Sequence, residues 1–134
     1  YTDVSLPLAW HEGVALFKLE QSEKAAIAFE RAYRLNPWSF QVINNYASAL
    51  AALKRFPEAI PLYEKALEIN PRYDEGKFNL SFIYYQMADF NHAEEWLERV
   101  DTIPNPATKA DVEKNRATIN RLQAFRKALE EKRH

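Results

Sequence analysis

The sequence predicts an all-α fold made of stacked helical hairpins, because small and large apolar residues recur together at a fixed interval of 34 residues. The small residues at one position of this period are Ala25, Ala59 and Ala93. The large residues at another position are Phe29, Tyr63 and Leu97. Pro37 and Pro71 stand one period apart and punctuate the pattern. Such a period is typical of a helical solenoid, in which each unit buries its apolar face against its neighbour.

The first period divides into two predicted helices. One runs from Ser5 to about Leu19, with Ser5 as its N-cap and a proline in its first turn. The other runs from Ser22 to Leu35, with Ser22 as its N-cap. The Asn-Pro pair that follows ends it, since a residue before proline is disfavoured in the helical region.

The second period repeats this design. Ser39 is the expected cap of a helix that runs to about Leu53, and a second helix runs from Pro57 to about Ile69. Pro61 falls inside this second helix, where its missing N–H removes one intrahelical hydrogen bond. We therefore expect a local distortion at this proline.

The third period predicts helices from Asp74 to about Met87 and from about Phe90 to Val100, followed by a loop over residues 102–106. A single longer helix is then expected over residues 108–132, starting at a capping box of Thr108 and Asp111. The apolar residues expected on one side of it are Val112, Ile119, Leu122, Phe125 and Leu129. We interpret this helix as the cap that closes the array.

The composition narrows the range of functions. Lys and Arg (18) nearly balance Asp and Glu (19), which argues against a nucleic-acid-binding surface. Cysteine is absent, and no apolar run reaches the ~20 residues of a membrane-spanning helix, so we expect no membrane insertion by this segment. We expect a soluble chain, cytoplasmic or periplasmic, and its composition does not assign the compartment. Because the chain opens with Tyr1 rather than Met, targeting signals further upstream stay an open alternative.

At this point the chain resembles the tetratricopeptide repeat family, whose period is also 34 residues. The pattern fits three repeats, over residues 6–39, 40–73 and 74–107, with the capping helix over 108–132 and a single domain over 1–134. The resemblance implies a right-handed superhelix with a concave groove lined by the first helix of each repeat. Glu12 and Ser22 depart from the bulky residues that the family has at their positions, which weakens the packing of the first repeat.

The resemblance also implies which side chains face the groove. The candidate binding residues are Trp10, His11, Val14, Phe17, Asn44, Asn45, Ser48, Phe78, Asn79, Phe82 and Tyr85. Asn45 and Asn79 stand one period apart, with His11 at the equivalent place in the first repeat. Carboxamides can pair with the backbone of an extended peptide, as in the asparagine ladder of the O-linked N-acetylglucosamine transferase family. Phe82 and Tyr85 are the two residues that we most expect the capping helix to cover.

One subtype of the family grips the acidic C-termini of chaperones through a carboxylate clamp of Lys, Arg and Asn side chains. The residues at the five clamp positions of this chain are Trp10, Val14, Asn45, Glu75 and Asn79. Only Asn45 matches the clamp, and Glu75 would repel a carboxylate. The sequence therefore predicts no binding to such peptides.

Catalysis and metal binding are not expected. The histidines lie on different elements, at positions 11, 92 and 134, and there is no cysteine nucleophile and no glycine-rich phosphate loop. We expect a non-enzymatic scaffold without cofactors, which binds a peptide or protein segment. Two alternatives stay open: a self-associating module, or the soluble repeat part of a larger bacterial membrane protein. The segments Val42–Tyr46 and Ile69–Glu75 are similar to repeats in O-antigen polymerase or ligase proteins.

Overall fold

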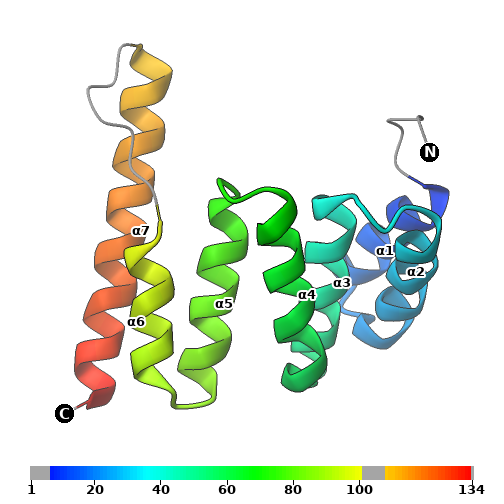
Figure 1. The fold of residues 1–134 in the computed structure, drawn as a ribbon, viewed down its shortest axis with the longest axis horizontal. Coiled ribbons are helices and arrows are strands. Elements are labelled where there is room, and N and C mark those ends of the chain that lie inside the picture. Colours follow the sequence, from blue (N-terminus) through cyan, green and yellow to red (C-terminus); the bar gives the residue numbers. More distant parts are fainter. Residues whose placement is uncertain (1–6, 101–107, 134) are drawn as a thin grey trace. The chain divides into compact units, whose positions relative to one another are not determined.

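The described part of the chain is all-α, as predicted. The computed structural model describes residues 7–100 and 108–133, with the side chains of Asp111, Asn115 and Arg133 left out. These residues contain seven helices (Figure 1). Their bounds are α1 Leu8–Lys18, α2 Ser22–Leu35, α3 Phe40–Ala52, α4 Phe56–Ile69, α5 Asp74–Gln86, α6 Phe90–Glu98 and α7 Lys109–Arg133. Most of these boundaries lie within two residues of the predicted ones, so the 34-residue period is confirmed as a structural period.

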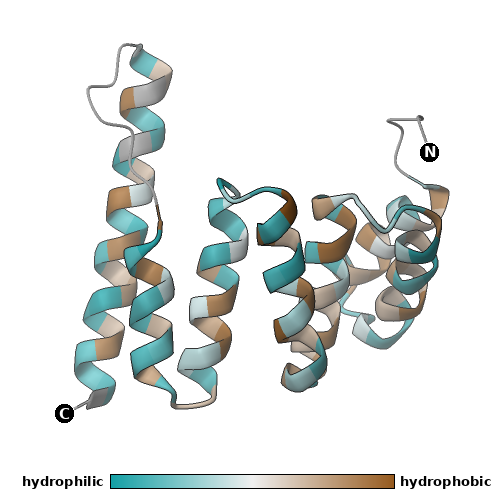
Figure 2. Cartoon of the chain, viewed as in Figure 1, coloured by the Kyte–Doolittle hydropathy of each residue, from teal (hydrophilic) through white to brown (hydrophobic). Residues whose placement is uncertain are grey.

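The chain divides into two compact units, the first ending at Asn79 and the second beginning at Leu80, so that the division falls within α5. In the first unit, α1 packs against α2 and α3 packs against α4, which gives two antiparallel hairpins (Figure 1). Helix α2 also packs against α3, so the two hairpins are joined side by side. Hydrophobic and hydrophilic bands alternate along these helices, as expected when one stripe of each is buried (Figure 2).

Small residues allow the two helices of each hairpin to approach closely. Ala25 and Ala59 have no exposed surface. Gly13 lies against the ring of Phe29, so that a Cβ atom at residue 13 would stand only 2.5 Å from the nearest ring carbon. The interior of the first hairpin is therefore filled by one large ring facing a position that has no side chain.

The turns inside the hairpins share one backbone geometry that the sequence analysis did not predict. Glu20, Lys54 and Ala88 have positive φ angles of 60°, 62° and 60°, and they stand one period apart. In the first turn, Glu20 N–H donates to the carbonyl of Phe17 and Gln21 N–H donates to that of Leu16, each at 3.0 Å. This pair of bonds is the Schellman motif, which usually places glycine at the left-handed position. Each of the three turns holds a non-glycine residue there.

The predicted N-caps have different outcomes. Ser39 caps α3 as predicted, because its hydroxyl accepts from the N–H of Val42 at 3.4 Å. The prediction for Ser22 is wrong: Ser22 is already the first helical residue, and Gln21 precedes it without a side-chain capping bond. Ser5 and the loop over 102–106 lie outside the described residues, as does the side chain of Asp111 in the predicted capping box.

Helix α4 tolerates its internal proline. It runs without a break from Phe56 to Ile69, with Pro57 as its second residue and Pro61 inside it. Both prolines are exposed, so the carbonyl that lacks a donor because of Pro61 can bind water instead of a backbone N–H. The lost bond therefore does not end the helix.

The second unit joins the C-terminal part of α5 to α6 and α7. The hydroxyl of Ser81 donates to the carbonyl of Ala93 at 2.7 Å, and both residues are fully buried. Helix α7 packs against α6, with Leu122 and Leu129 only 6% and 4% exposed. The prediction of one buried apolar side along the whole of α7 is wrong for its N-terminal half, where Val112 and Ile119 are 40% and 39% exposed.

Candidate functional site

Two hydrogen bonds link the candidate binding residues of the first unit, and both cross from one repeat to the next. The indole Nε1 of Trp10 donates to the Oδ1 of Asn45 at 2.9 Å. The Nδ2 of Asn79 donates to the Oδ1 of Asn44 at 3.2 Å. In each pair the partners are 35 residues apart, one more than the period, so the fifth residue of one repeat bonds the sixth residue of the following one. These side chains therefore form a repeated polar link between helices.

Each link leaves part of an amide available for a ligand. Asn45 uses its oxygen in the bond to Trp10, and its Nδ2 group stays a potential donor. Asn79 uses its Nδ2 group, and its Oδ1 stays a potential acceptor. Both side chains are half-buried, so these atoms remain accessible from one side. One donor and one acceptor are the groups that a peptide backbone requires.

Two of the predicted groove residues are buried. Asn44 is 5% exposed and Phe78 is 3% exposed. Asn44 is the acceptor for Asn79, and its burial belongs to the link between repeats. The prediction that these two side chains face an open groove is therefore wrong, because packing and hydrogen bonding already use them.

The candidate residues on α1 are Trp10, His11, Val14 and Phe17. The ring of His11 meets the ring of Trp10 edge-on, with 4.9 Å between centroids. His11 is exposed, whereas Trp10, Val14 and Phe17 are half-buried. Trp10 therefore has its N–H group engaged in the hydrogen bond to Asn45, whereas its half-buried ring still offers an apolar face.

Ser48 on α3 has a partner that the sequence analysis missed. Its hydroxyl oxygen lies 2.7 Å from the phenolic oxygen of Tyr63 on α4. Tyr63 is 2% exposed, and this burial raises the pKa of its hydroxyl well above the ordinary value near 10, although the bond to Ser48 acts in the opposite direction. Tyr63 therefore stays neutral over the physiological range and holds the Ser48 side chain in place.

The second unit contains an apolar pocket of about 320 Å³. It is lined by Phe82 and Tyr85 of α5 and by Ala124, Phe125 and Ala128 of α7. The rings of Phe82 and Tyr85 are stacked at 6.4 Å, and Phe125 meets Phe82 edge-on at the same distance. Phe82 is 47% exposed, so the capping helix covers this aromatic pair only in part.

Three of the residues that line this pocket were not predicted as site residues. Ala124 and Ala128 are four residues apart on α7, so they lie on one face of the helix. Small side chains on the helix that faces two aromatic rings leave room for a guest side chain. The spacing of the two alanines is visible in the sequence, but only the packing of α7 shows that they line a pocket.

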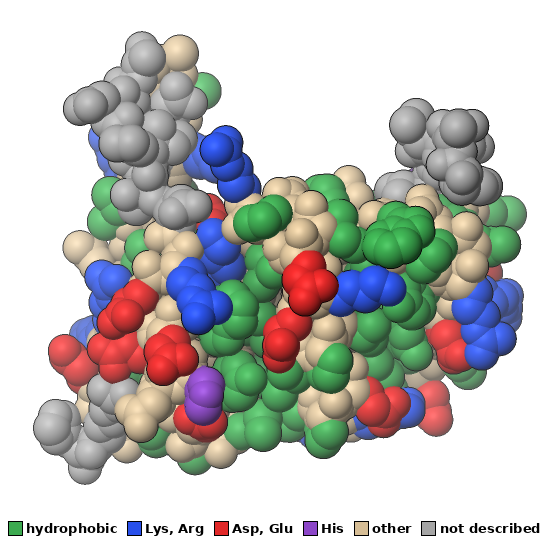
Figure 3. Space-filling model, in the orientation of Figure 1, with side chains coloured by type: hydrophobic (Ala, Val, Ile, Leu, Met, Phe, Trp, Pro, Cys, Tyr) green, Lys and Arg blue, Asp and Glu red, His purple; other side chains and the backbone are tan. Residues whose placement is uncertain are grey.

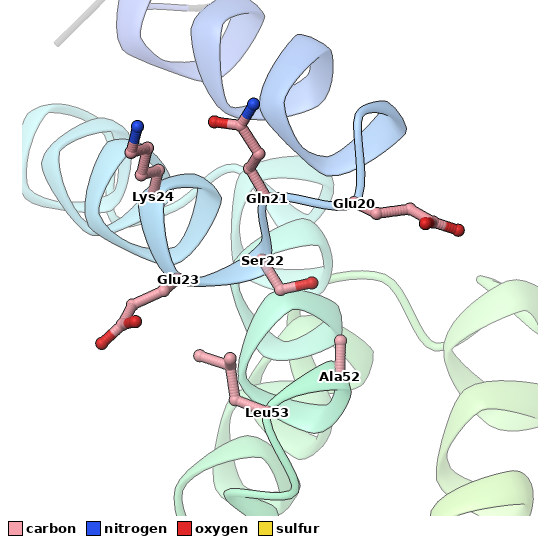
Figure 4. A pocket seen from close by; sticks show the side chains of 7 residues that line it. All are labelled: Glu20, Gln21, Ser22, Glu23, Lys24, Ala52 and Leu53. Atoms are coloured by element: carbon pink, nitrogen blue, oxygen red, sulfur yellow. The ribbon is translucent and has the colours of Figure 1, made fainter.

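A second hollow of about 480 Å³ lies in the first unit. It is lined by Glu20, Gln21, Ser22, Glu23, Lys24, Ala52 and Leu53 (Figure 4). Ser22 points toward Ala52 and Leu53, whereas the charged side chains of Glu20, Glu23 and Lys24 point in different directions (Figure 4). Because its polar groups do not converge, this hollow lacks the arrangement of a specific ligand site.

An aromatic cluster between α2, α4 and the turn after α2 holds a lysine. The Nζ of Lys65 donates to the hydroxyl of Tyr33 at 2.7 Å and lies 4.8 Å and 5.4 Å from the ring centroids of Tyr33 and Trp38. This geometry is that of a cation–π contact. Trp38 itself is 72% exposed.

On the face drawn in Figure 3, acidic and basic side chains are interspersed.

The described residues offer no metal centre and no membrane span. None of their His, Asp and Glu side chains gather in groups of three or more that could hold a metal ion. Within the same residues, no helix combines the length and the apolar character needed to cross a membrane. Every buried side-chain nitrogen or oxygen of this part has a hydrogen-bond partner.

Comparisons with known proteins agree with the repeat pattern. Two family models, each described as a tetratricopeptide repeat, match residues 7–37 and 50–104. The chain is 28% identical over 85 residues to the peroxisomal targeting signal receptor of Saccharomyces cerevisiae. It is 26% identical over 98 residues to the Hsp70-Hsp90 organizing protein 1 of Glycine max. These matches cover 63% and 72% of this chain, but only 14% and 17% of the two relatives.

Solved structures show the same fold. The TPR2B domain of yeast Sti1, in a complex with pHsp70, matches with a TM-score of 0.77 and 23% identity, covering 92% of this chain and 94% of that one. The translocator chaperone SycD of Yersinia enterocolitica matches with a TM-score of 0.80 and 13% identity, covering 99% and 97%. The curated relatives are named as a targeting signal receptor and an organizing protein, which is consistent with a protein-interaction scaffold. The repeat pattern, the hairpin architecture and these matches together show that the chain belongs to the tetratricopeptide repeat family.

Proposed function

We propose that this chain binds an extended peptide segment of a partner protein on the face formed by the first helices of its repeats. The observation that carries this proposal is that the side-chain amides of Asn45 and Asn79 each use one of their two polar groups in a hydrogen bond to a neighbouring repeat. Each is fixed by a bond to the neighbouring repeat and keeps a donor or an acceptor for a ligand. A fixed amide loses little side-chain entropy when it binds, so its hydrogen bond contributes more to affinity.

The apolar part of the affinity comes from the pocket of Phe82, Tyr85 and Phe125. Burying a large apolar side chain of a ligand contributes ~1.5–3 kcal/mol. The pocket volume of about 320 Å³ suits one such side chain, and its lining carries few polar groups. We therefore infer a ligand with an aromatic or aliphatic anchor residue, whose backbone pairs with carboxamides.

Asn79 and Phe82 offer two different kinds of contact: the amide of Asn79 offers a hydrogen bond and the ring of Phe82 an apolar surface. Acidic C-terminal peptides do not fit this chemistry, because Trp10, Glu75 and Asn79 stand at the three positions where the clamp has a cation.

The test is a selection of random linear peptides on the immobilised chain, followed by calorimetry of the selected peptides. Phe82→Ala removes the anchor ring and should weaken the selected peptides at least ~10-fold, which corresponds to ~1.4 kcal/mol. Ile27→Ala is the matched control, because Ile27 is similarly exposed, at 52%, but lies on α2 outside this face. It should leave affinity unchanged.

Two results would overturn the proposal. Peptides that bind the Phe82→Ala variant as tightly as the parent chain would place binding elsewhere. Tight binding of an acidic peptide ending in EEVD, without loss in the Phe82→Ala variant, would favour a charge-based mode instead. Thermal melts of both variants show whether they keep the fold, since neither substitution removes a fully buried side chain.

A further inference from the structure

Helix α1 carries a stripe of residues that is open in this structure. Leu8, Glu12, Ala15 and Leu19 follow the spacing i, i+4, i+7, i+11, so they lie along one face of the helix and its C-cap. All four are exposed, with Leu8 at 83% and Leu19 at 67%. We call these four residues the α1 stripe.

The equivalent residues of the next repeat show which helix packs on such a stripe. The residues 34 positions later, on α3, are Val42, Tyr46, Ala49 and Leu53. Val42 and Ala49 have no exposed surface, and the other two are half-buried. Helix α2 covers this face, with the rings of Tyr33 and Tyr46 6.0 Å apart. The stripe is therefore the surface through which a repeat receives the helix that precedes it.

Helix α7 offers a stripe of the same length. Val112, Arg116, Ile119 and Gln123 follow the same spacing, and all four are exposed. We call them the α7 stripe. The buried residues Leu122 and Leu129 lie on a different side of the helix, centred about 100° from the stripe at ~100° per residue. The stripe is thus separate from the face that α7 uses to pack in its own unit.

The two stripes are complementary in charge as well as in spacing. When the helices are aligned in parallel, Leu8 faces Val112, Glu12 faces Arg116 and Ala15 faces Ile119. Opposite charges then meet within an apolar strip, which favours this register over others. Pairing two copies of one stripe would instead bring two Glu12 carboxylates, or two Arg116 guanidinium groups, into the same contact.

We propose that the α1 stripe of one copy of this chain docks on the α7 stripe of a second copy. The contact is heterologous, so each pair leaves one free stripe of each kind, and the association continues head to tail. A contact between two four-residue stripes is small, so the association is weak and depends on concentration. It is independent of the peptide-binding face, because no residue of the pocket around Phe82 belongs to either stripe.

The test is sedimentation velocity of the 134-residue chain from about 10 µM to about 1 mM, a range that covers weak interfaces of this size. The parent chain should form species that grow with concentration beyond a dimer. Glu12→Arg alone and Arg116→Glu alone should each stay monomeric, since each places like charges across the contact. An equimolar mixture of the two variants should associate again, because each then meets an opposite charge on the other.

Two charge changes outside the stripes serve as controls. Lys114→Glu lies on α7 about 160° from Arg116, and Glu68→Arg lies on an exposed position of α4. Both should associate like the parent chain. A parent chain that is monomeric throughout the range, single variants that still associate, or a mixture that stays monomeric would each overturn the proposal. Circular dichroism confirms that every variant is folded, which the exposure of the changed residues favours.

Discussion

The first two hairpins of the chain follow one sequence pattern but differ in how much of it they bury. Leu8 is 83% exposed, whereas Val42, one period later, has no exposed surface. The same contrast holds between the exposed Ala15 and the fully buried Ala49. In both hairpins, however, the small residue on the second helix is fully buried, at Ala25 and at Ala59.

The difference teaches that two kinds of position exist in this repeat. Positions that face the partner helix of the same hairpin are buried in either repeat, because that helix is always present. Positions that face a neighbouring hairpin are buried where that hairpin packs on them, as α2 packs on α3. A repeat sequence therefore specifies an interface, and the neighbour decides whether it is filled.

The largest expected effect tests this distinction with one substitution at two equivalent positions. Val42→Asp places a carboxylate where no surface is exposed and should lower the free energy of unfolding by at least ~3 kcal/mol. Leu8→Asp places the same group in water and should change it by no more than ~0.5 kcal/mol. Urea denaturation at low protein concentration measures both. A cost for Leu8→Asp that equals that for Val42→Asp would mean that the α1 stripe is already covered.

A smaller effect is expected inside the first hairpin. Gly13→Ala puts a methyl group 2.5 Å from the ring of Phe29, and overpacking of this kind costs ~1–3 kcal/mol. The better helix propensity of alanine returns ~1 kcal/mol, so a net loss of up to about 2 kcal/mol is expected.

The matched comparison is the double variant Gly13→Ala with Phe29→Leu. The smaller side chain at residue 29 makes room for the methyl group, so the two changes should cost less together than the sum of their separate costs. Additive costs would show that the glycine is there for another reason. The second hairpin already has the larger pair at these positions, Ala47 with Tyr63.

Much of the fold could be predicted from the sequence because it depends on contacts inside one period. The small residues at Ala25 and Ala59 and the proline after each second helix recur with the period, so their roles could be read by repetition. The left-handed turns at Glu20 and Lys54 could not, since neither residue is a glycine and no local signal marks them. The cap at Ser22 failed for a related reason: the last donor of the Schellman motif, Gln21, directly precedes Ser22 and already takes the place before the helix.

The candidate site was less predictable because several of its residues also form contacts between neighbouring helices. Asn45 and Asn79 were found from their spacing, but their bonds to Trp10 and Asn44 depend on how neighbouring helices meet. Phe78 was expected on an open face and is buried. A sequence pattern gives the face of a helix on which a residue lies, but it does not give how far the neighbouring helix extends over that face.

The hydroxyl of Tyr63 distinguishes the two hairpins chemically, because Phe29 occupies the same place in the first. Tyr63→Phe removes the bond to Ser48 and should cost ~1 kcal/mol at pH 7. Burial raises the pKa of Tyr63 in the folded state, so its contribution is complete below pH 10 and is lost as the pH rises above 10. The cost of the substitution should therefore shrink in that alkaline range. Urea denaturation at pH 7 and at pH 11 measures this, and an equal cost at both values would contradict the assignment.

The smallest expected effect concerns a feature in which the two hairpins are alike. Glu20→Gly and Lys54→Gly each relieve a left-handed residue that costs ~1–2 kcal/mol for a non-glycine side chain. The greater freedom of glycine in the unfolded chain offsets part of this, so each variant should gain about 0.5–1 kcal/mol. Arg31→Gly, at an exposed position inside α2, is the control and should lose ~1 kcal/mol. Equal gains at residues 20 and 54 would show that turn geometry, unlike the burial of Leu8 and Val42, is set within one hairpin. A gain at only one of them would mean that the neighbouring hairpin also shapes the turn.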